Sequence, residues 1–235
     1  MDSDWPETLC HRIDQVAQAN GAQVALMDCA PNPRVLTYSD MINHVEAVAE
    51  GLKNAGVGSG ARVLVFQQPT VDWACSMLAI LRIGAIYIPL DLRNPLVRLA
   101  AVARDCEADV VLAHAATVDD APQLHISKII NVSILPDRPT APVTISARAG
   151  DPAAILYTSG STGTPKGIIV THTGLRNEIE GYTKSQGLAS ERVLQQSAMT
   201  FNHASDQMYT GLVNGGMVYV VSSDKRGDPL EITKM

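Results

Sequence analysis

Residues 158–167 carry the chemical groups expected of a loop that binds a chain of phosphates. The stretch holds three glycines, two serines, three threonines, one proline and Lys166. Glycine permits backbone angles that a Cβ forbids. Hydroxyl groups and free backbone amides can surround an anion, and the lysine adds a positive point charge. The apolar residues 153–157 and 168–170 predict two strands joined by this loop.

The loop differs from a Walker A motif, which needs glycine before the lysine and a hydroxyl residue after it. Here Pro165 precedes Lys166 and Gly167 follows it, and the chain returns as a strand instead of entering a helix. The alternative reading is a flexible surface hairpin rich in serine, glycine and threonine. The order of the residues favours the phosphate-binding loop over this alternative.

The string AAILYTSGSTGTPKG at 153–167 resembles the signature loop of the adenylate-forming superfamily. That superfamily includes acyl-CoA synthetases, luciferases and the adenylation domains of nonribosomal peptide synthetases. The resemblance implies that the loop grips the β- and γ-phosphates of ATP while a carboxylate attacks the α-phosphate, giving an acyl adenylate and pyrophosphate. It assigns Lys166 a catalytic role and assigns to ATP binding Thr158, Ser159, Gly160, Ser161, Thr162, Gly163, Thr164, Lys166 and Gly167.

Residues 199–221 resemble the acyl-pocket segment of adenylation domains, with Phe201 at the first aromatic position and Gly215 at a turn. The resemblance implies that Phe201, Asn202, His203 and Asp206 bind the acid. Relatives that activate amino acids usually carry aspartate where this chain has Asn202, because that carboxylate pairs with the substrate ammonium. Relatives that activate aryl acids use asparagine there.

Asp206 follows Asn202 by one helical turn, so it could face the same cavity and supply the missing charge. The alternative is that both are polar residues at a helix start. For His203, lining the pocket and facing solvent are equally open alternatives.

The chain most resembles adenylation domains of fungal polyketide–nonribosomal peptide hybrid synthetases, of which it matches only the first half. Motifs for adenine, ribose and Mg²⁺ and the C-terminal lid domain have no counterpart in it. We therefore expect weak or no activity from the isolated chain, with a Mg²⁺ ligand coming from the missing C-terminal part. The expected partners are an amino or related carboxylic acid and a carrier domain bearing phosphopantetheine. The alternatives are a non-catalytic remnant that binds nucleotide phosphates, and a fragment of an acyl-CoA or aryl-acid ligase.

Helices and strands alternate before the loop, which predicts an α/β fold with a doubly wound, mostly parallel sheet and helices on both faces. The expected helices are 9–19, 39–54, 72–82 and 98–106, with Ser39 as the N-cap of the second. The expected strands are 24–27, 35–37, 62–66, 85–90, 109–113 and 129–132. The expected organisation is a first α/β subdomain at 1–134, a linker at 135–152, and the loop with the start of an acyl-pocket subdomain at 153–235.

Composition narrows the class of protein. Of the 235 residues, 46% are hydrophobic and 18% charged, which allows a sizeable core. The net charge of −6, without a Lys/Arg cluster, disfavours a nucleic-acid partner. No apolar run approaches the roughly 18 residues of a membrane span. The four cysteines form no CxxC pair, so we assign no metal site and expect a reducing, cytoplasmic compartment.

Overall fold

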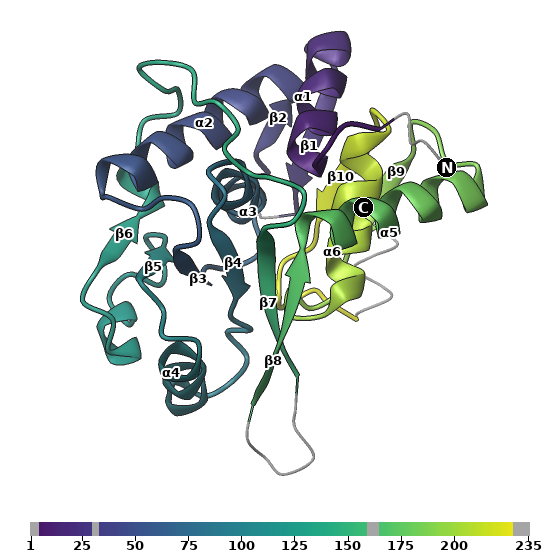
Figure 1. Ribbon diagram of the computed structural model, residues 1–235. Helices are drawn as coiled ribbons and strands as arrows, with labels where there is room; N and C mark the ends of the chain where they lie inside the picture. Colours follow the sequence, from purple (N-terminus) through teal and green to yellow (C-terminus); the bar gives the residue numbers. More distant parts are fainter. Residues whose placement is uncertain (1–4, 30–32, 159–164, 228–235) are drawn as a thin grey trace.

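The computed structural model of the chain describes residues 5–29, 33–158 and 165–227 (Figure 1). Within this part the strands form two sheets, one of six strands and one of four, which we call the larger and the smaller sheet. No helix of the described residues combines the length and the hydropathy that crossing a bilayer requires.

The larger sheet has the strand order β6-β5-β3-β4-β7-β8. Its first five strands in this order are parallel to their neighbours, and β8 runs antiparallel to β7. The bounds are β3 Arg62–Phe66, β4 Ile86–Pro89, β5 Val110–Ala113, β6 Ile129–Asn131, β7 Pro152–Thr158 and β8 Lys166–Thr171. Short 3₁₀ helices lie at Ala121–Leu124 and Val132–Ile134.

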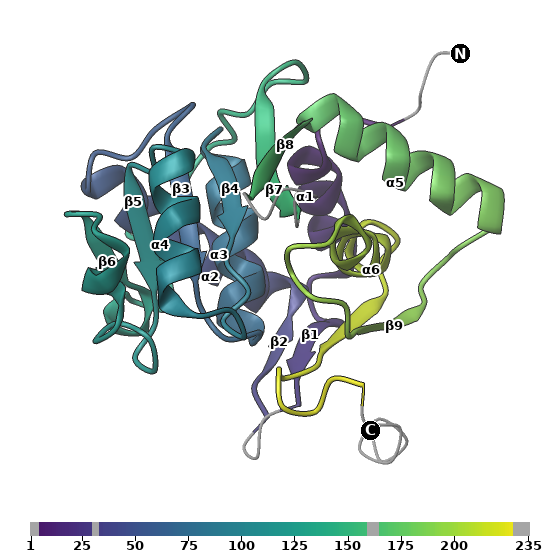
Figure 2. The same ribbon diagram turned by 90° about the horizontal axis from the view of Figure 1, so that it is seen from below.

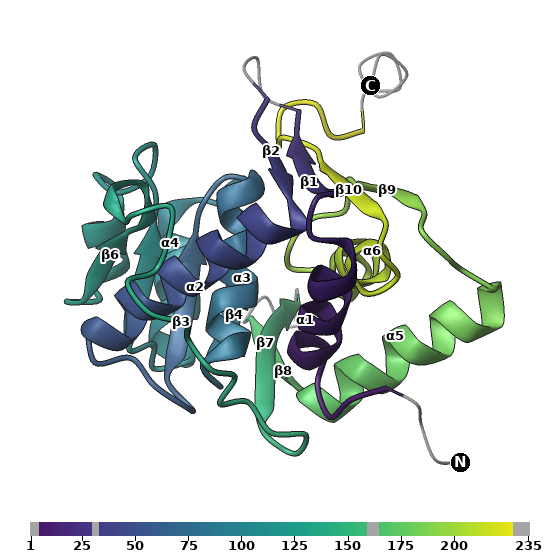
Figure 3. The same cartoon turned by 90° about the horizontal axis from the view of Figure 1, so that it is seen from above.

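Helices cover both faces of the larger sheet, as the sequence predicts. Val63 and Val65 of β3 belong to the hydrophobic cluster that holds α2 (Tyr38–Asn54) and α3 (Val71–Arg82). Leu64 and Phe66 belong to the cluster that holds α4 (Leu96–Asp105). Successive side chains of a strand point to opposite faces, so this division puts α4 across the sheet from α2 and α3. Figures 2 and 3 view the molecule from opposite sides, with α4 in front of the sheet in one and α2 in the other.

The smaller sheet corrects one expectation about the N-terminal strands. Its order is β2-β1-β10-β9, with β1 Val24–Asp28, β2 Val35–Thr37, β9 Arg192–Gln195 and β10 Met217–Val220. The alternation of helix and strand suggested that 24–37 joins the same sheet as 62–113, but β1 pairs with β10 near the other end of the chain. Periodicity identifies a strand without identifying its partner. The expected boundary at 135–152 therefore does not separate the two sheets.

The remaining helices are α1 Leu9–Asn20, α5 His172–Gln186 and α6 Asn202–Val213. Helix α5 packs against β8 and α6, and α1 packs against α6. The sequence suggested Ser39 as the N-cap of α2, but the N-cap is Thr37. The Thr37 hydroxyl accepts a hydrogen bond from the Asp40 amide at 3.1 Å, which satisfies one of the free donors at the helix start.

Candidate functional site

The crevice between the carboxyl ends of β4 and β7 is the candidate site. These strands are parallel neighbours, and the strands that follow them in sequence lie toward opposite edges of the sheet. After β4 it passes through α4 and returns as β5, on the far side of β3, whereas after β7 it turns outward into β8. In open α/β sheets such a change of direction leaves a crevice at the carboxyl ends of the strands, where ligands bind.

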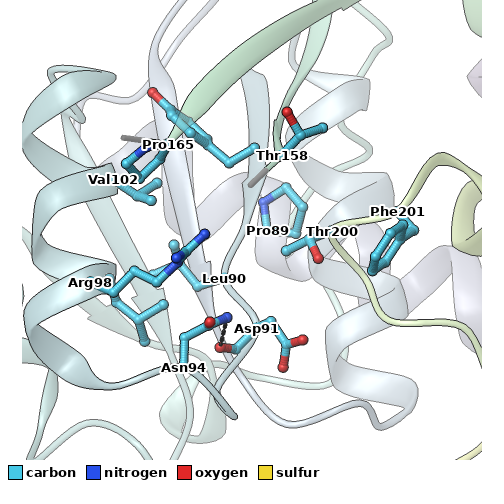
Figure 4. Close-up of a pocket in the computed structure, with 12 residues that line it drawn as sticks. Pro89, Leu90, Asp91, Asn94, Arg98, Val102, Thr158, Pro165, Thr200 and Phe201 are labelled. Carbon is cyan, nitrogen blue, oxygen red and sulfur yellow. Dashed lines mark hydrogen bonds between the residues drawn. The ribbon is translucent and has the colours of Figure 1, made fainter. Parts of the chain in front are cut away.

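A cavity of about 250 Å³ occupies this crevice (Figure 4). Four segments form its wall: the end of β4, helix α4 with the turn before it, the two ends of the β7–β8 hairpin, and the approach to α6. The volume lies just below the roughly 300–1,000 Å³ of pockets that enclose a whole small molecule. The lining residues are Pro89, Leu90, Asp91, Asn94, Arg98, Leu99, Val102, Tyr157, Thr158, Pro165, Thr200 and Phe201.

Asp91 at the end of β4 is held by a two-pronged ion pair with Arg93. The Arg93 Nη2 lies 2.7 Å from Asp91 Oδ2, and its Nε lies 3.0 Å from Oδ1. Burial opposes ionisation of Asp91, but the Arg93 hydrogen bonds and charge and the nearby Arg226 charge outweigh it and lower the pKa of this carboxyl. Asp91 is therefore an ionised, already paired group in the cavity wall.

Tyr157 closes the cavity beside α4. Its hydroxyl donates a hydrogen bond of 2.5 Å to Asp105 Oδ2, and burial together with this bond raises the pKa of the phenol. Gly167, across the hairpin, makes room for the ring. A Cβ on Gly167 would lie 2.9 Å from Ile155 Cγ2 and 3.2 Å from Tyr157 Cζ. Gly167 lacks the positive φ expected from its place in the loop, so close packing is what requires glycine there.

The phosphate-loop residues fall only partly within the described chain. Thr158 and Lys166 are paired across the base of the hairpin, and Thr158 and Pro165 line the cavity. Lys166 is exposed and does not line it. The other residues assigned to ATP in this loop lie outside the described residues: Ser159, Gly160, Ser161, Thr162, Gly163 and Thr164.

The acyl-pocket residues gather at the start of α6. Phe201 is 65% exposed and lines the cavity. Asn202 begins the helix, and its side chain lies outside the described part. His203 is exposed, with its Nδ1 3.4 Å from Asp206 Oδ2, while Asp206 is half-buried. Neither His203 nor Asp206 lines the cavity, so of the three acyl-pocket side chains that the structure describes only Phe201 borders the cavity beside the hairpin.

A second, more apolar hollow of about 460 Å³ shares Phe201 with the first. Leu156, Ile168 and Val170 of the hairpin face it, together with Gly174 and Glu178 of α5. Thr158, Thr200 and Phe201 line both hollows. Phe201 thus borders both a cavity lined by charged groups and a hollow lined mainly by aliphatic side chains.

Two other features bear on the chemistry. Among the described residues no group of three or more His, Cys, Asp and Glu side chains could hold a metal ion. His172 at the start of α5 is 2% exposed, and its Nε2 has no hydrogen-bond partner in the described part of the chain. Burial lowers the pKa of His172, which keeps it neutral.

Comparison with known proteins agrees with this architecture. The family model described as AMP-binding enzyme matches residues 13–235. The hybrid PKS-NRPS synthetase thnA of Trichoderma harzianum is 66% identical over 235 residues, covering 99% of this chain and 6% of that protein. The hybrid PKS-NRPS synthetase traA of Penicillium crustosum is 56% identical over 238 residues, covering 100% of this chain and again 6% of the relative. The chain therefore spans only a small part of these proteins.

Solved structures show the same fold. The nonribosomal peptide synthetase FmoA3, in its AMPPNP-bound form, superposes with a TM-score of 0.83 at 24% identity, covering 94% of this chain and 23% of that one. VinN gives a TM-score of 0.83 at 18% identity, covering 94% and 60%. The N-terminal subdomain of Klebsiella oxytoca NpsA gives 0.78 at 21% identity, covering 92% and 55%. At these identities the likeness is one of fold.

Proposed function

Because the chain belongs to the AMP-binding enzyme family, we propose that it forms the N-terminal part of an adenylation domain in a hybrid polyketide–nonribosomal peptide synthetase. The reaction joins an amino or related carboxylic acid to AMP. A carboxylate oxygen of the acid attacks the α-phosphorus of ATP, and the bond to the β-phosphate oxygen breaks, releasing pyrophosphate. Positioning and charge stabilisation supply most of the catalysis in such a transfer.

The observation that carries the proposal is the position of the hairpin. Residues 158–167 emerge at the carboxyl end of β7, beside the carboxyl end of β4, and both ends of the loop border the cavity there. A loop of glycines, hydroxyl residues and one lysine at such a crevice fits the polyphosphate of ATP. Two hollows that share Phe201, one with charged groups and one more apolar, fit a reaction that joins a phosphate to an acyl group.

The residues present fit ATP better than they fit its metal. The Thr158 hydroxyl and Lys166, at the base of the hairpin, are the described loop groups that can reach phosphate oxygens. Mg²⁺ neutralises phosphate charge when it is bound, but the described residues offer no cluster to hold it. We therefore assign no residue of the chain to Mg²⁺. Phosphopantetheine belongs, in this proposal, to a carrier domain that accepts the activated acid.

The acid enters from the side of α6. Phe201 lines the apolar hollow, and we assign Asn202, His203 and Asp206 of the first helical turns to substrate recognition. An ammonium group in such a pocket requires a counter-charge. Asp206 is the carboxylate available on this turn, and Asn202 offers only a dipole. An Asn202→Asp variant is expected to shift preference toward acids that carry an α-ammonium group.

ATP–pyrophosphate exchange tests the function. The adenylation module that contains this chain is assayed with a panel of amino and aryl acids, and Lys166→Ala is compared with Lys53→Ala, an exposed lysine at the end of α2. We expect Lys166→Ala to lower exchange by about 100- to 1,000-fold, the usual loss for one group that stabilises developing charge, while Lys53→Ala keeps full activity. Absence of exchange with every acid, or full exchange in Lys166→Ala, would reject the assignment.

A further inference from the structure

We propose that Arg98 of α4 binds a phosphate group inside the cavity between β4, α4 and the β7–β8 hairpin. The inference rests on the proposed function for the identity of the ligand, and on the cavity alone for the existence of an anion site. It adds to the loop a cation from a different element of the fold, one that neither the motif nor the family match assigns.

The placement of Arg98 follows from how α4 packs. Leu99 and Val102 are buried against the larger sheet and anchor the helix. Arg98, one residue before Leu99, is half-buried and lines the cavity together with them. Figure 4 shows its guanidinium extended from α4 toward the middle of the cavity. Helix packing therefore directs this charge inward.

The carboxylates near Arg98 already have other hydrogen-bond partners. Asp91 is the only acidic residue among the described residues of the lining. It forms a two-pronged ion pair with Arg93, and Arg93 and Arg226 lower its pKa. Asp105 accepts the hydrogen bond of Tyr157. Within the described residues Arg98 makes no ion pair and no hydrogen bond with another side chain. Its guanidinium keeps all five N–H donors available.

A half-buried guanidinium without a counter-charge is costly, and an anion removes that cost. The planar fork of arginine matches two oxygens of a phosphate group in a bidentate arrangement. The cavity of about 250 Å³ is smaller than pockets that hold a whole nucleotide-sized ligand. These features select a phosphate group, with the rest of its molecule outside the cavity.

Two molecules of the proposed reaction carry such a group: the pyrophosphate portion of ATP, and the phosphodiester at the root of the phosphopantetheine arm. The contact chemistry is the same for both, so the experiment uses both probes. Binding of inorganic pyrophosphate and of 4′-phosphopantetheine to the 235-residue chain is measured by calorimetry. The variants are Arg98→Gln, Arg98→Lys and Arg104→Gln. Arg104 lies on the same helix and is exposed, so its loss changes the net charge equally without touching the cavity.

We expect Arg98→Gln to weaken the binding of at least one probe by about tenfold or more, since hydrogen bonds to charged groups are worth at least that much. Arg98→Lys keeps the charge but loses the fork and is expected to fall between wild type and Arg98→Gln. Arg104→Gln is expected to bind as wild type. A loss confined to pyrophosphate identifies ATP as the source, and a loss confined to phosphopantetheine identifies the carrier arm. Thermal melts establish that each variant is folded.

The inference is overturned if wild type binds neither probe saturably, or if Arg98→Gln binds both probes as tightly as wild type. Failure of the proposed function is a separate result. It appears as a wild-type module without pyrophosphate exchange, and binding of phosphate that depends on Arg98 would survive it.

Discussion

Replacing Tyr38 with phenylalanine tests how the two ends of the chain are joined. Tyr38 begins α2 and is fully buried. Its hydroxyl lies 3.0 Å from the Leu212 carbonyl and 2.9 Å from the Gly216 carbonyl, at the end of α6 and in the turn before β10. The last carbonyls of a helix have no partner within the helix, and here a residue 174 positions away in sequence supplies one.

The magnitude follows from one lost donor. A phenol has a single O–H hydrogen, so the two carbonyls share it. Phenylalanine keeps the ring, so no large cavity forms. The Leu212 carbonyl still accepts a hydrogen bond from the Gly215 amide at 3.4 Å, so the cost is that of leaving the Gly216 carbonyl without the Tyr38 donor, about 1–3 kcal/mol. A change of 1 kcal/mol moves Tm by about 2–4 °C in a protein of this size. We therefore expect the Tm of Tyr38→Phe to fall by about 2–12 °C.

Thermal melts and urea unfolding measure this effect. The urea midpoint is expected to fall at an unchanged m-value, because the exposed area on unfolding stays the same. Tyr182→Phe is the matched control, since Tyr182 is 47% exposed and its loss is expected to leave the Tm unchanged. A Tyr38→Phe protein that melts with wild type, or a control that loses as much, would refute the claim that this hydroxyl joins α2 to α6.

Three further substitutions test other contacts. A Cβ on Gly211 would lie 2.5 Å from Val218 Cγ2, so Gly211→Ala should lower the free energy of unfolding, measured by urea titration, by about 1–3 kcal/mol. Gly181 lies on α5 with open space where a Cβ would be, so Gly181→Ala should stabilise the protein slightly in the same titration. Burial lowers the pKa of His172 in the folded protein, so the unfolded chain binds the proton more readily. The stability that His172 contributes is therefore present above its ordinary pKa of about 6.5 and is lost as the pH falls below that value. Urea midpoints measured between about pH 8 and pH 5 should fall less steeply in His172→Gln than in wild type. Arg82→Met leaves the partly buried carboxylates of Asp14 and Glu46 without their cation. It should lower the free energy of unfolding, measured by urea unfolding, by about 3–5 kcal/mol.

Local features of the fold could be predicted from the sequence because neighbouring residues determine them. Residues 39–54 were expected to form a helix and residues 62–66 a strand, and the structure has α2 and β3 at these places. Gly215 was expected at a turn, and it has φ +77° between α6 and β10. Each of these depends on the properties of a few consecutive residues, so a single sequence contains the information.

Features that depend on distant residues could not be predicted. Nothing in the composition of β1 indicates that its partner is β10, nearly 200 positions away. The place of Asp91 in the cavity wall could not be predicted, because that wall exists only once the hairpin lies beside β4. Glycine at 167 is required by the side chains of Ile155 and Tyr157 across the hairpin. No local pattern pointed to Arg98, because its proposed role in anion binding depends on which carboxylates near it in the fold are already paired.

The position of the crevice depends in turn on a buried charge that has no part in its chemistry. Arg82, at the end of α3, lies 2.8 Å from Asp14 of α1 and 2.6 Å from Glu46 of α2, and its Nε donates to the Val143 carbonyl at 2.6 Å. Val143 belongs to the segment that leads into β7, so this guanidinium fixes two helices and the path by which β7 reaches its place beside β4. Because β7 carries the loop, weakening this cluster should displace the loop and the cavity beside it, although the loop sequence is unchanged. Mutations at Arg82 are therefore expected to lower phosphate affinity although the residue lies outside the cavity.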